Sequence, residues 1–465
     1  MYNTKKYIHL IRVNLYILES LLPRFGSLLF LPILLNFISS TIWSEIVLMI
    51  AVSEILSKLY LFGFQNSIFR FAKNLNIDDF SSIFTKLLKR LFFISIVLFI
   101  FLESFHELFW NNLFEFKYGL PMRSTLVLGV FFTLNIFFTE YVKAIQLSRK
   151  LVTGGILYTI LNFSLQFSSI YFISIFYGRT DRMIVTAYLF STALASIIKS
   201  IYFYRSLNLN FIFKKTNKTK VIKLFDNYAT PSAYLSIIAI FSTHGSKIIA
   251  QQNISLSLLG KYFVYLSFAN VFLNLFLSAQ NYLLPSIFQK KSEESISIRV
   301  TLLYFSLFTG HLYYLIFNVL EKFVIPESFL LDTNIVYLIF LTQIIATLRI
   351  QPGNYYSISQ KINKKLFLQS MGVILLTIGL INSFDIKSLV VSYLIFYALT
   401  TVLFVIFSGE LFFLKHILVI TSFVLIFFYF QIYNSIPSFI SVFLLVLVVA
   451  FIFQTLNKEI TKLFE

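Results

Sequence analysis

One basic stretch organises the chain, and it reads RSLNLNFIFKKTNKTKVIK from Arg205 to Lys223. It carries six basic residues and no acidic residue. Long and mostly apolar segments lie on both sides of it. A basic bridge between two hydrophobic halves is typical of a cytoplasmic loop that joins two bundles of membrane-spanning helices. The sequence therefore predicts two helical lobes joined at this stretch.

The composition indicates a protein that is solvated by hydrocarbon. Its 465 residues are 58% hydrophobic and only 12% charged, whereas soluble domains carry roughly 25% charged residues. Apolar runs of about 20 residues recur along the chain, and each can cross a ~30 Å hydrocarbon core as a helix. We therefore expect an all-α polytopic membrane protein with about 14 transmembrane helices.

The hydropathy pattern places these helices along the whole chain. The expected spans are 10–38, 42–66, 90–111, 122–146, 151–177, 183–204, 226–250, 259–286, 298–320, 334–352, 366–382, 388–408, 414–434 and 437–456. The first span holds Pro23, Gly26 and Pro32, which predict a kinked or broken helix.

The basic residues predict the orientation in the membrane. With both termini in the cytoplasm, 25 of the 38 basic residues fall in inner segments and six in outer segments. Lys and Arg collect on cytoplasmic loops, so the net charge of +18 reflects topology and does not indicate nucleic-acid binding. One missed span would invert every later loop. The bias therefore favours an even number of spans.

The bridge divides the expected spans into equal halves. The predicted parts are a six-helix lobe at 1–206, a basic linker at 207–224, a second six-helix lobe at 225–410 and two further helices at 411–465. Equal halves indicate a duplicated bundle with a site at the interface of the repeats. No loop is long enough for a catalytic domain, and the sequence has no P-loop, Gly-x-Ser-x-Gly elbow or metal-ligand spacing. We therefore expect a protein that is not an enzyme and has no cofactor or metal.

Ionisable residues inside spans are costly and are functional candidates. They are Arg12, Glu19, Arg24, Glu45, Glu54, Lys58, Lys199, His244, Lys247, Lys261, His311 and Arg349. Arg12 and Lys199 lie near the inner ends of their spans, and Lys261 lies near the outer interface. The remaining lysine and arginine candidates without an acidic residue four positions away are Arg24, Lys247 and Arg349. One interpretation is that they line a cationic cavity. The other is that they pair with a glutamate from a neighbouring helix.

Two glutamates, Glu19 and Glu54, are the candidates for proton coupling. Glu54 also lies four residues before Lys58, in the order that favours mutual neutralisation on a helix. Lys58 is therefore either the partner of Glu54 or a further cation of the substrate site.

Polar side chains recur at helical spacing on three spans. They are Ser267, Asn270, Asn274, Ser278 and Asn281; Thr159, Asn162, Gln166 and Ser169; and Ser232, Ser236, Thr243 and Lys247. One interpretation is hydrogen bonding between helices, worth about 0.6 kcal/mol per contact. The other is a hydrated cavity, in which amides and cations bind a sugar that bears phosphate.

Several short motifs resemble those of polysaccharide-exporting flippases. The stretch LFGFQNSIFRF at Leu61–Phe71 is similar to their leucine–glycine–arginine–aromatic signature, and Ala144–Lys150 and Ser359–Lys365 are similar to their basic inner loops. The run from Pro231 to Pro285 resembles their seventh and eighth helices. The family often has an acid–base pair where this chain has Ser246 and Lys247.

The resemblance implies an O-antigen or capsule flippase of the multidrug/oligosaccharidyl-lipid/polysaccharide superfamily. It implies two six-helix lobes in a V with two extra helices, in the bacterial cytoplasmic membrane. The implied substrate is a polyprenyl-diphosphate-linked oligosaccharide, and the implied partners are membrane lipid, a polysaccharide polymerase and chain-length proteins. The alternatives are a drug/cation antiporter of the same fold, or a membrane polysaccharide polymerase or ligase.

Overall fold

The computed structural model describes only part of the chain. The described residues are 26, 30–71, 75, 77–113, 120–145, 147–176, 181–207, 220–289, 292–358 and 362–408. Within these ranges every regular element is a helix, which confirms the all-α prediction. Most of the first span, where Pro23, Gly26 and Pro32 predict a kink, lies outside them, as do the spans expected at 414–434 and 437–456.

The helices follow the hydropathy pattern closely. They are α2 (Ser40–Leu61), α3 (Phe64–Phe71), α4 (Ile77–Leu113), α5 (Leu120–Ala144), α6 (Ser148–Phe176), α7 (Asp181–Ser206), α8 (Lys220–Ile240), the π-helix η2 (Phe241–Gly245), α9 (Ser246–Ala250), α10 (Leu256–Gln289), α11 (Ser292–Val324), the 3₁₀ helix η3 (Glu327–Phe329), α12 (Thr333–Ile358), α13 (Ile362–Ile381) and α14 (Ile386–Ser408). Each expected span from the second to the twelfth overlaps one of these helices. Of the described helical stretches, seven are long and apolar enough to cross a bilayer.

The structure corrects two expected spans. The second breaks at Phe62 and Gly63, whose φ angles of 42° and 78° end α2 and start α3. The third was expected at 90–111, but α4 begins at Ile77 and bends at Phe105, where φ is −123° and ψ is 19°. Hydropathy marks only the apolar part of a helix. The more polar turns at the start of α4, before residue 90, are therefore not marked by hydropathy as part of a span.

The chain divides into two compact units. The first runs to Val264 and includes Leu376–Ile386, and the second comprises Tyr265–Leu375 and the residues from Lys387 onward. The lobe boundaries expected at the basic linker stay a prediction.

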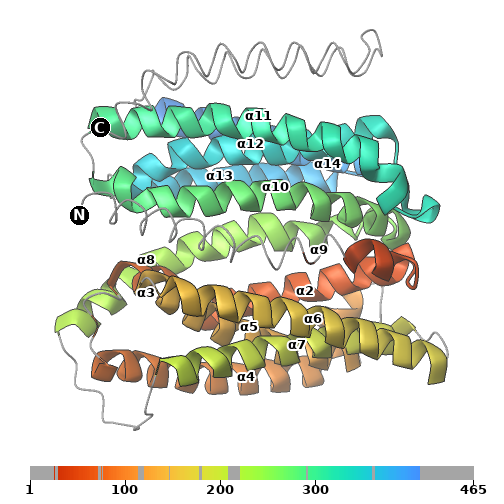
Figure 1. The fold of residues 1–465 in the computed structure, drawn as a ribbon, viewed down its shortest axis with the longest axis horizontal. Helices are drawn as coiled ribbons and strands as arrows, with labels where there is room; N and C mark the ends of the chain where they lie inside the picture. The colour runs from red at the N-terminus through yellow and green to blue at the C-terminus, as the bar shows by residue number, and fades with distance from the viewer. Residues whose placement is uncertain are drawn as a thin grey trace. The chain divides into compact units, whose positions relative to one another are not determined.

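Within the first unit, α5 and α6 pack against α7, and α2 packs against α5 (Figure 1). Aromatic rings fill the contact between α4 and α5, where Phe80 stacks on Tyr141 with centroids 3.8 Å apart. The helices α2 and α3 also contact α8. This contact brings the helix that follows the basic linker onto the second expected span.

Within the second unit, α11 packs along α12 (Figure 1). The aromatic rings of Tyr314 and Phe317 meet Phe340 at centroid distances of 5.4 and 4.9 Å. The buried Tyr265 hydroxyl donates to Glu321 Oε1 and accepts from the Leu331 N–H. This bond ties α10 to the end of α11 and satisfies a buried carboxylate.

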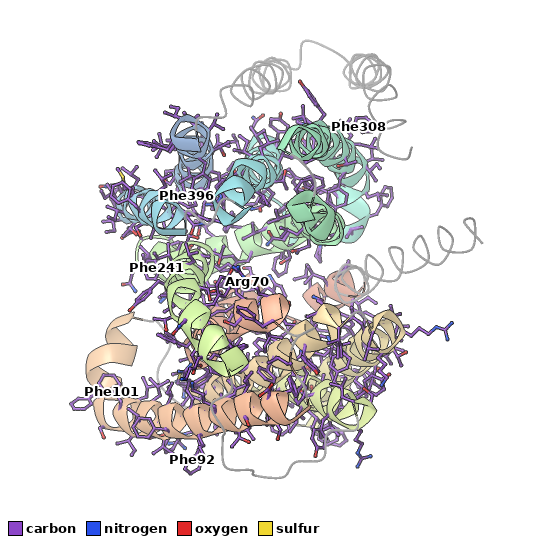
Figure 2. The ribbon with its side chains drawn as sticks, turned by 90° about the vertical axis from the view of Figure 1, so that its left-hand side faces the viewer. Arg70, Phe92, Phe101, Phe241, Phe308 and Phe396 are labelled. Atoms are coloured by element: carbon purple, nitrogen blue, oxygen red, sulfur yellow. The ribbon has the colours of Figure 1, made fainter. Side chains whose placement is uncertain are left out.

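The outer face of α4 is suited to acyl chains. Phe92 is 72% exposed and Phe93 is 69% exposed, and Figure 2 shows Phe92 and Phe101 projecting away from this helix. A contiguous apolar surface of this kind is rare in water but is expected in a bilayer. The chain is a multi-pass membrane protein.

Candidate functional site

The candidate site residues are distributed over both units. Arg24 and Glu19 lie outside the described residues. The first unit holds Glu54, Lys58, Asn162, Gln166 and Lys247, and the second holds Asn270, Asn274 and Arg349. A substrate cavity shared by the two halves stays a prediction.

In the first unit, Glu54 of α2 is the centre of a charged cluster. Its Oε2 lies 2.8 Å from His244 Nε2 on η2. The charged groups that act on the Glu54 carboxylate are His244, Lys247 and Lys58, in decreasing order. One acid therefore lies among three basic groups, and its nearest partner is a histidine from another helix. We name Glu54, His244, Lys247 and Lys58 the α2–η2 cluster.

The surroundings of Lys247 resemble the second interpretation, in which the cation pairs with a glutamate of a neighbouring helix. Its ammonium is attracted to Glu54 and lies 5.7 Å from the centre of the Phe263 ring. The acid that the resemblance places before Lys247 is replaced by Ser246. The structure thus places a carboxylate near Lys247, and this carboxylate comes from α2, which is distant in the sequence.

Lys58 has its own partners. Its Nζ donates to Gln65 Oε1, and it is attracted to Glu140 before Glu54. Glu140 in turn pairs with Lys143 at 3.7 Å on α5. Neutralisation within one helix, which the spacing of Glu54 and Lys58 suggested, is therefore not the main pairing of either residue.

His244 was one of the ionisable residues found inside the spans, but it was not assigned to the site from the sequence. The histidines were considered for metal binding, and their spacing excluded it. The sequence feature that could have identified it is the run of polar residues at Thr243–Lys247, which also contains a glycine. The π-helix η2 makes this histidine unusual, because π-helical turns are rare and are frequent at functional sites.

The amides of α6 face α7. Buried Gln166 donates from Nε2 to Asn162 Oδ1 at 3.1 Å and to Thr192 Oγ1 at 2.8 Å. Ser169 and Ser191 continue the row with an Oγ–Oγ distance of 3.0 Å. Here the polar stripe is used for hydrogen bonding between helices, and a role of Asn162 and Gln166 in binding sugar stays a prediction.

Replacing Gln166 by leucine should leave Asn162 and Thr192 without a buried donor. We expect a loss of about 1–3 kcal/mol of stability, the usual penalty for a buried polar group that loses its partner. The measurement is the thermal midpoint of the detergent-solubilised protein, with exposed Gln252→Leu as the control. An unchanged midpoint in Gln166→Leu would show that this amide does not stabilise the contact of α6 with α7.

The stripe on the seventh expected span is also used in packing. Ser232 Oγ donates to Gly63 O at 3.2 Å, and Asn66 Nδ2 donates to Ser236 Oγ at 3.4 Å. These bonds join α8 to the turn before α3 and to α3 itself. Asn270 and Asn274 of α10 are half-buried in the second unit.

In the second unit, Arg349 of α12 lies over two aromatic rings of α14. Its guanidinium carbon is 5.2 Å from the centre of the Phe396 ring and 4.9 Å from that of Tyr397; Figure 2 labels Phe396. Among the described residues, no carboxylate lies within ion-pair distance of Arg349. The aromatic faces stabilise the cation without neutralising it.

A second cation lies near Arg349. Lys365 precedes the apolar stretch Phe367–Ile381. Burial and repulsion by the Arg349 guanidinium lower the pKa of Lys365 to about 8. Two basic groups brought close together favour the binding of an anion.

Solved structures match the chain in fold, while neither a protein-family model nor a curated protein sequence matches it. One is an inward-facing multidrug resistance MATE family transporter of the MOP superfamily, with a TM-score of 0.58 and 9% identity over 86% of this chain and 94% of its own. An outward-facing structure of such a transporter has a TM-score of 0.57 and 10% identity, over 86% and 95% of the chains.

A third match is a MOP superfamily transporter from Pyrococcus furiosus, described as having a binding pocket of reversed polarity that suggests a different function. Its TM-score is 0.57 and its identity 10%, over 86% of this chain and 95% of its own. At these identities the likeness concerns the fold. The chain is an all-helical membrane protein with the fold of MOP superfamily transporters.

Proposed function

We propose that the protein is a flippase that moves a polyprenyl-diphosphate-linked oligosaccharide, an O-antigen or capsular repeat unit, from the inner to the outer leaflet. Alternating access carries the substrate across, in the bacterial cytoplasmic membrane, with both termini in the cytoplasm. Inward-facing and outward-facing structures of transporters with this fold support the mechanism. The motifs at Leu61–Phe71 and Ala144–Lys150 support the substrate class.

The observation that carries the proposal is the excess of cations on membrane helices. Arg349 lies on aromatic rings with Lys365 nearby, and the α2–η2 cluster holds three basic groups around one acid. A diphosphate is excluded from hydrocarbon unless fixed charges compensate it. Cations are therefore what the transport of a lipid-linked diphosphate requires, and among the described residues the α2–η2 cluster holds more basic groups than acids.

The competing proposal is a drug/cation antiporter. It is favoured by the matches to multidrug transporters with this fold. A cationic drug requires acidic groups, however, and Glu54 is surrounded by basic ones. Ethidium efflux from cells that express the protein separates the two functions. We expect no efflux above that of the vector control.

Substitution of Arg24 and Lys247 by alanine tests the cationic site. We expect each variant to lower surface polysaccharide about tenfold at equal protein level, which corresponds to ~1.4 kcal/mol in the transport barrier. Exposed Lys387→Ala is the matched control and should leave export unchanged. Unchanged polysaccharide in both variants would remove these residues from the site.

The location of the accumulated intermediate separates a flippase from a polymerase or ligase. A deletion strain that lacks a flippase accumulates the lipid-linked unit in the inner leaflet, where the downstream polymerase and chain-length proteins do not reach it. Accumulation in the outer leaflet would contradict the proposal.

A further inference from the structure

The contact between α2 and η2 contains a pair of groups that can exchange a proton. Glu54 Oε2 and His244 Nε2 are 2.8 Å apart, a distance that requires one hydrogen between the two atoms. The Glu54 side chain is 38% exposed and the His244 side chain 17% exposed. The carboxylate is therefore the more exposed member of the pair, and the imidazole lies further inside.

The second ring nitrogen of His244 has an unusual environment. His244 Nδ1 is buried and has no hydrogen-bond partner among the described residues. When the ring carries one proton, at Nε2, the lone pair of Nδ1 accepts no hydrogen bond from the described residues. With a second proton it would be a buried N–H that donates to nothing, which is costly. The observed packing therefore favours the form of the pair that holds a single proton.

The backbone at His244 supports a movable contact. His244 lies in the five-residue π-helix Phe241–Gly245, where the Ser246 N–H bonds to Phe241 O. A π turn carries one more residue than an α turn, and its removal or migration rotates the residues that follow. A change of this turn would alter the contact between α2 and the segment α8–α9 and would expose Nδ1.

Charged and titratable groups from α2, α5, α6, α7 and α9 lie around the pair or its neighbours. Lys58 of α2 and Lys247 of α9 act on Glu54. On α6, Tyr158 interacts electrostatically with Glu54. On α7, the Lys199 ammonium lies 5.3 Å from the centre of the Tyr158 ring.

From α5, Glu140 and Lys143 act on Lys58 and not on the pair directly. Two cations, Lys58 and Lys247, therefore lie near the Glu54 carboxylate in addition to His244.

We propose that Glu54 and His244 form a proton-binding pair that takes up a second proton, at His244 Nδ1, when the α2–η2 contact rearranges. The proton adds to the imidazole lone pair and gives an imidazolium, whose charge the Glu54 carboxylate balances. The packing of α8–α9 on α2 is thereby coupled to protonation. This inference rests on the proposed function only in that the chain is a transporter, and it is independent of the substrate.

Infrared difference spectroscopy of the full-length protein in lipid nanodiscs tests the pair. Spectra are recorded between about pH 5 and pH 8, the range in which histidine ordinarily titrates. The wild type, with ring-labelled histidine, should show an imidazolium band that His244→Gln removes. Glu54→Gln should shift that band. His106→Gln on α4 is the control and should keep the His244 band unchanged.

Identical pH-difference bands in the wild type, His244→Gln and Glu54→Gln would overturn the proposal. If a variant does not fold, the ring-labelled wild type still decides, because absence of an imidazolium band from a histidine coupled to a carboxylate contradicts the pair. The proposed function is tested separately by lipid-linked intermediates in the deletion strain. A normal band with outer-leaflet accumulation would refute the flippase and leave the proton site intact.

Discussion

Replacing Gly63 by alanine is expected to remove most of the folded protein from the membrane. Gly63 has φ +78°, and a Cβ atom there would lie 1.9 Å from Ala229 O. The left-handed backbone and the backbone clash act together, and we expect a destabilisation of about 3 kcal/mol or more. The measurement is the thermal midpoint and yield of the detergent-solubilised protein by fluorescence size-exclusion chromatography.

Gly129→Ala is the matched control for this substitution. Gly129 is a helical glycine whose added Cβ would lie 3.1 Å from Leu56 Cβ and 3.3 Å from Ser53 O. These contacts need a shift of only a few tenths of an ångström. The control should therefore fold with a smaller loss than Gly63→Ala. A Gly63→Ala protein with the yield and midpoint of the wild type would contradict the close approach of α8.

The reason for this sensitivity is that α8–α9 and the start of α10 meet α2 and α3 by backbone contact. Gly63 lies against Ala229 and Ala233, and a Cβ on Gly260 would lie 1.8 Å from Ser40 O. Ser40 and Ser257 join the same ends of α2 and α10 with an Oγ–Oγ distance of 2.9 Å.

Reversing the charge of Arg349 is expected to have the largest effect on transport. In Arg349→Glu a carboxylate would replace the guanidinium over Phe396 and Tyr397, next to Lys365. It would repel a diphosphate and pair with the neighbouring lysine. We expect surface polysaccharide to fall at least about tenfold, or ~1.4 kcal/mol in the barrier, at an unchanged protein level.

Two further variants make this result specific. Arg349→Lys keeps the charge but loses the planar group that stacks on the rings, so an intermediate level of export is expected. Lys322→Glu reverses an exposed charge near the end of α11 and should have no effect. Equal export from Arg349→Glu and Lys322→Glu would show that Arg349 does not contribute to the passage of the substrate.

The spans were predictable because hydropathy is a local property. Every helix from α2 to α14 contains or continues an apolar run, and the expected limits of the fourth to sixth spans agree with α5, α6 and α7 within a few residues. The break at Phe62–Gly63 was not predicted. The hydropathy of Leu61–Phe71 did not mark this turn, which brings Gly63 against the backbone of Ala229.

The sequence predicted which residues could belong to the candidate site, but it did not predict which groups they would contact. Lys247 and Arg349 were selected because no acid lies four residues away, and the structure gives them different environments. Lys247 is attracted to Glu54 of α2, whereas Arg349 lies over aromatic rings of α14. Gln166, selected because polar residues recur at helical spacing, bonds to Thr192 of the next helix.

The sequence alone determined that the chain lies in a bilayer as a series of helices, because the transfer of apolar side chains out of water depends on composition and run length. It also supplied the intramembrane ionisable residues, since each is costly wherever it lies. Only the tertiary structure decided the partner of each. Ion pairs and hydrogen bonds form between helix faces that are distant in sequence, and His244 meets Glu54 because α2 and η2 pack together.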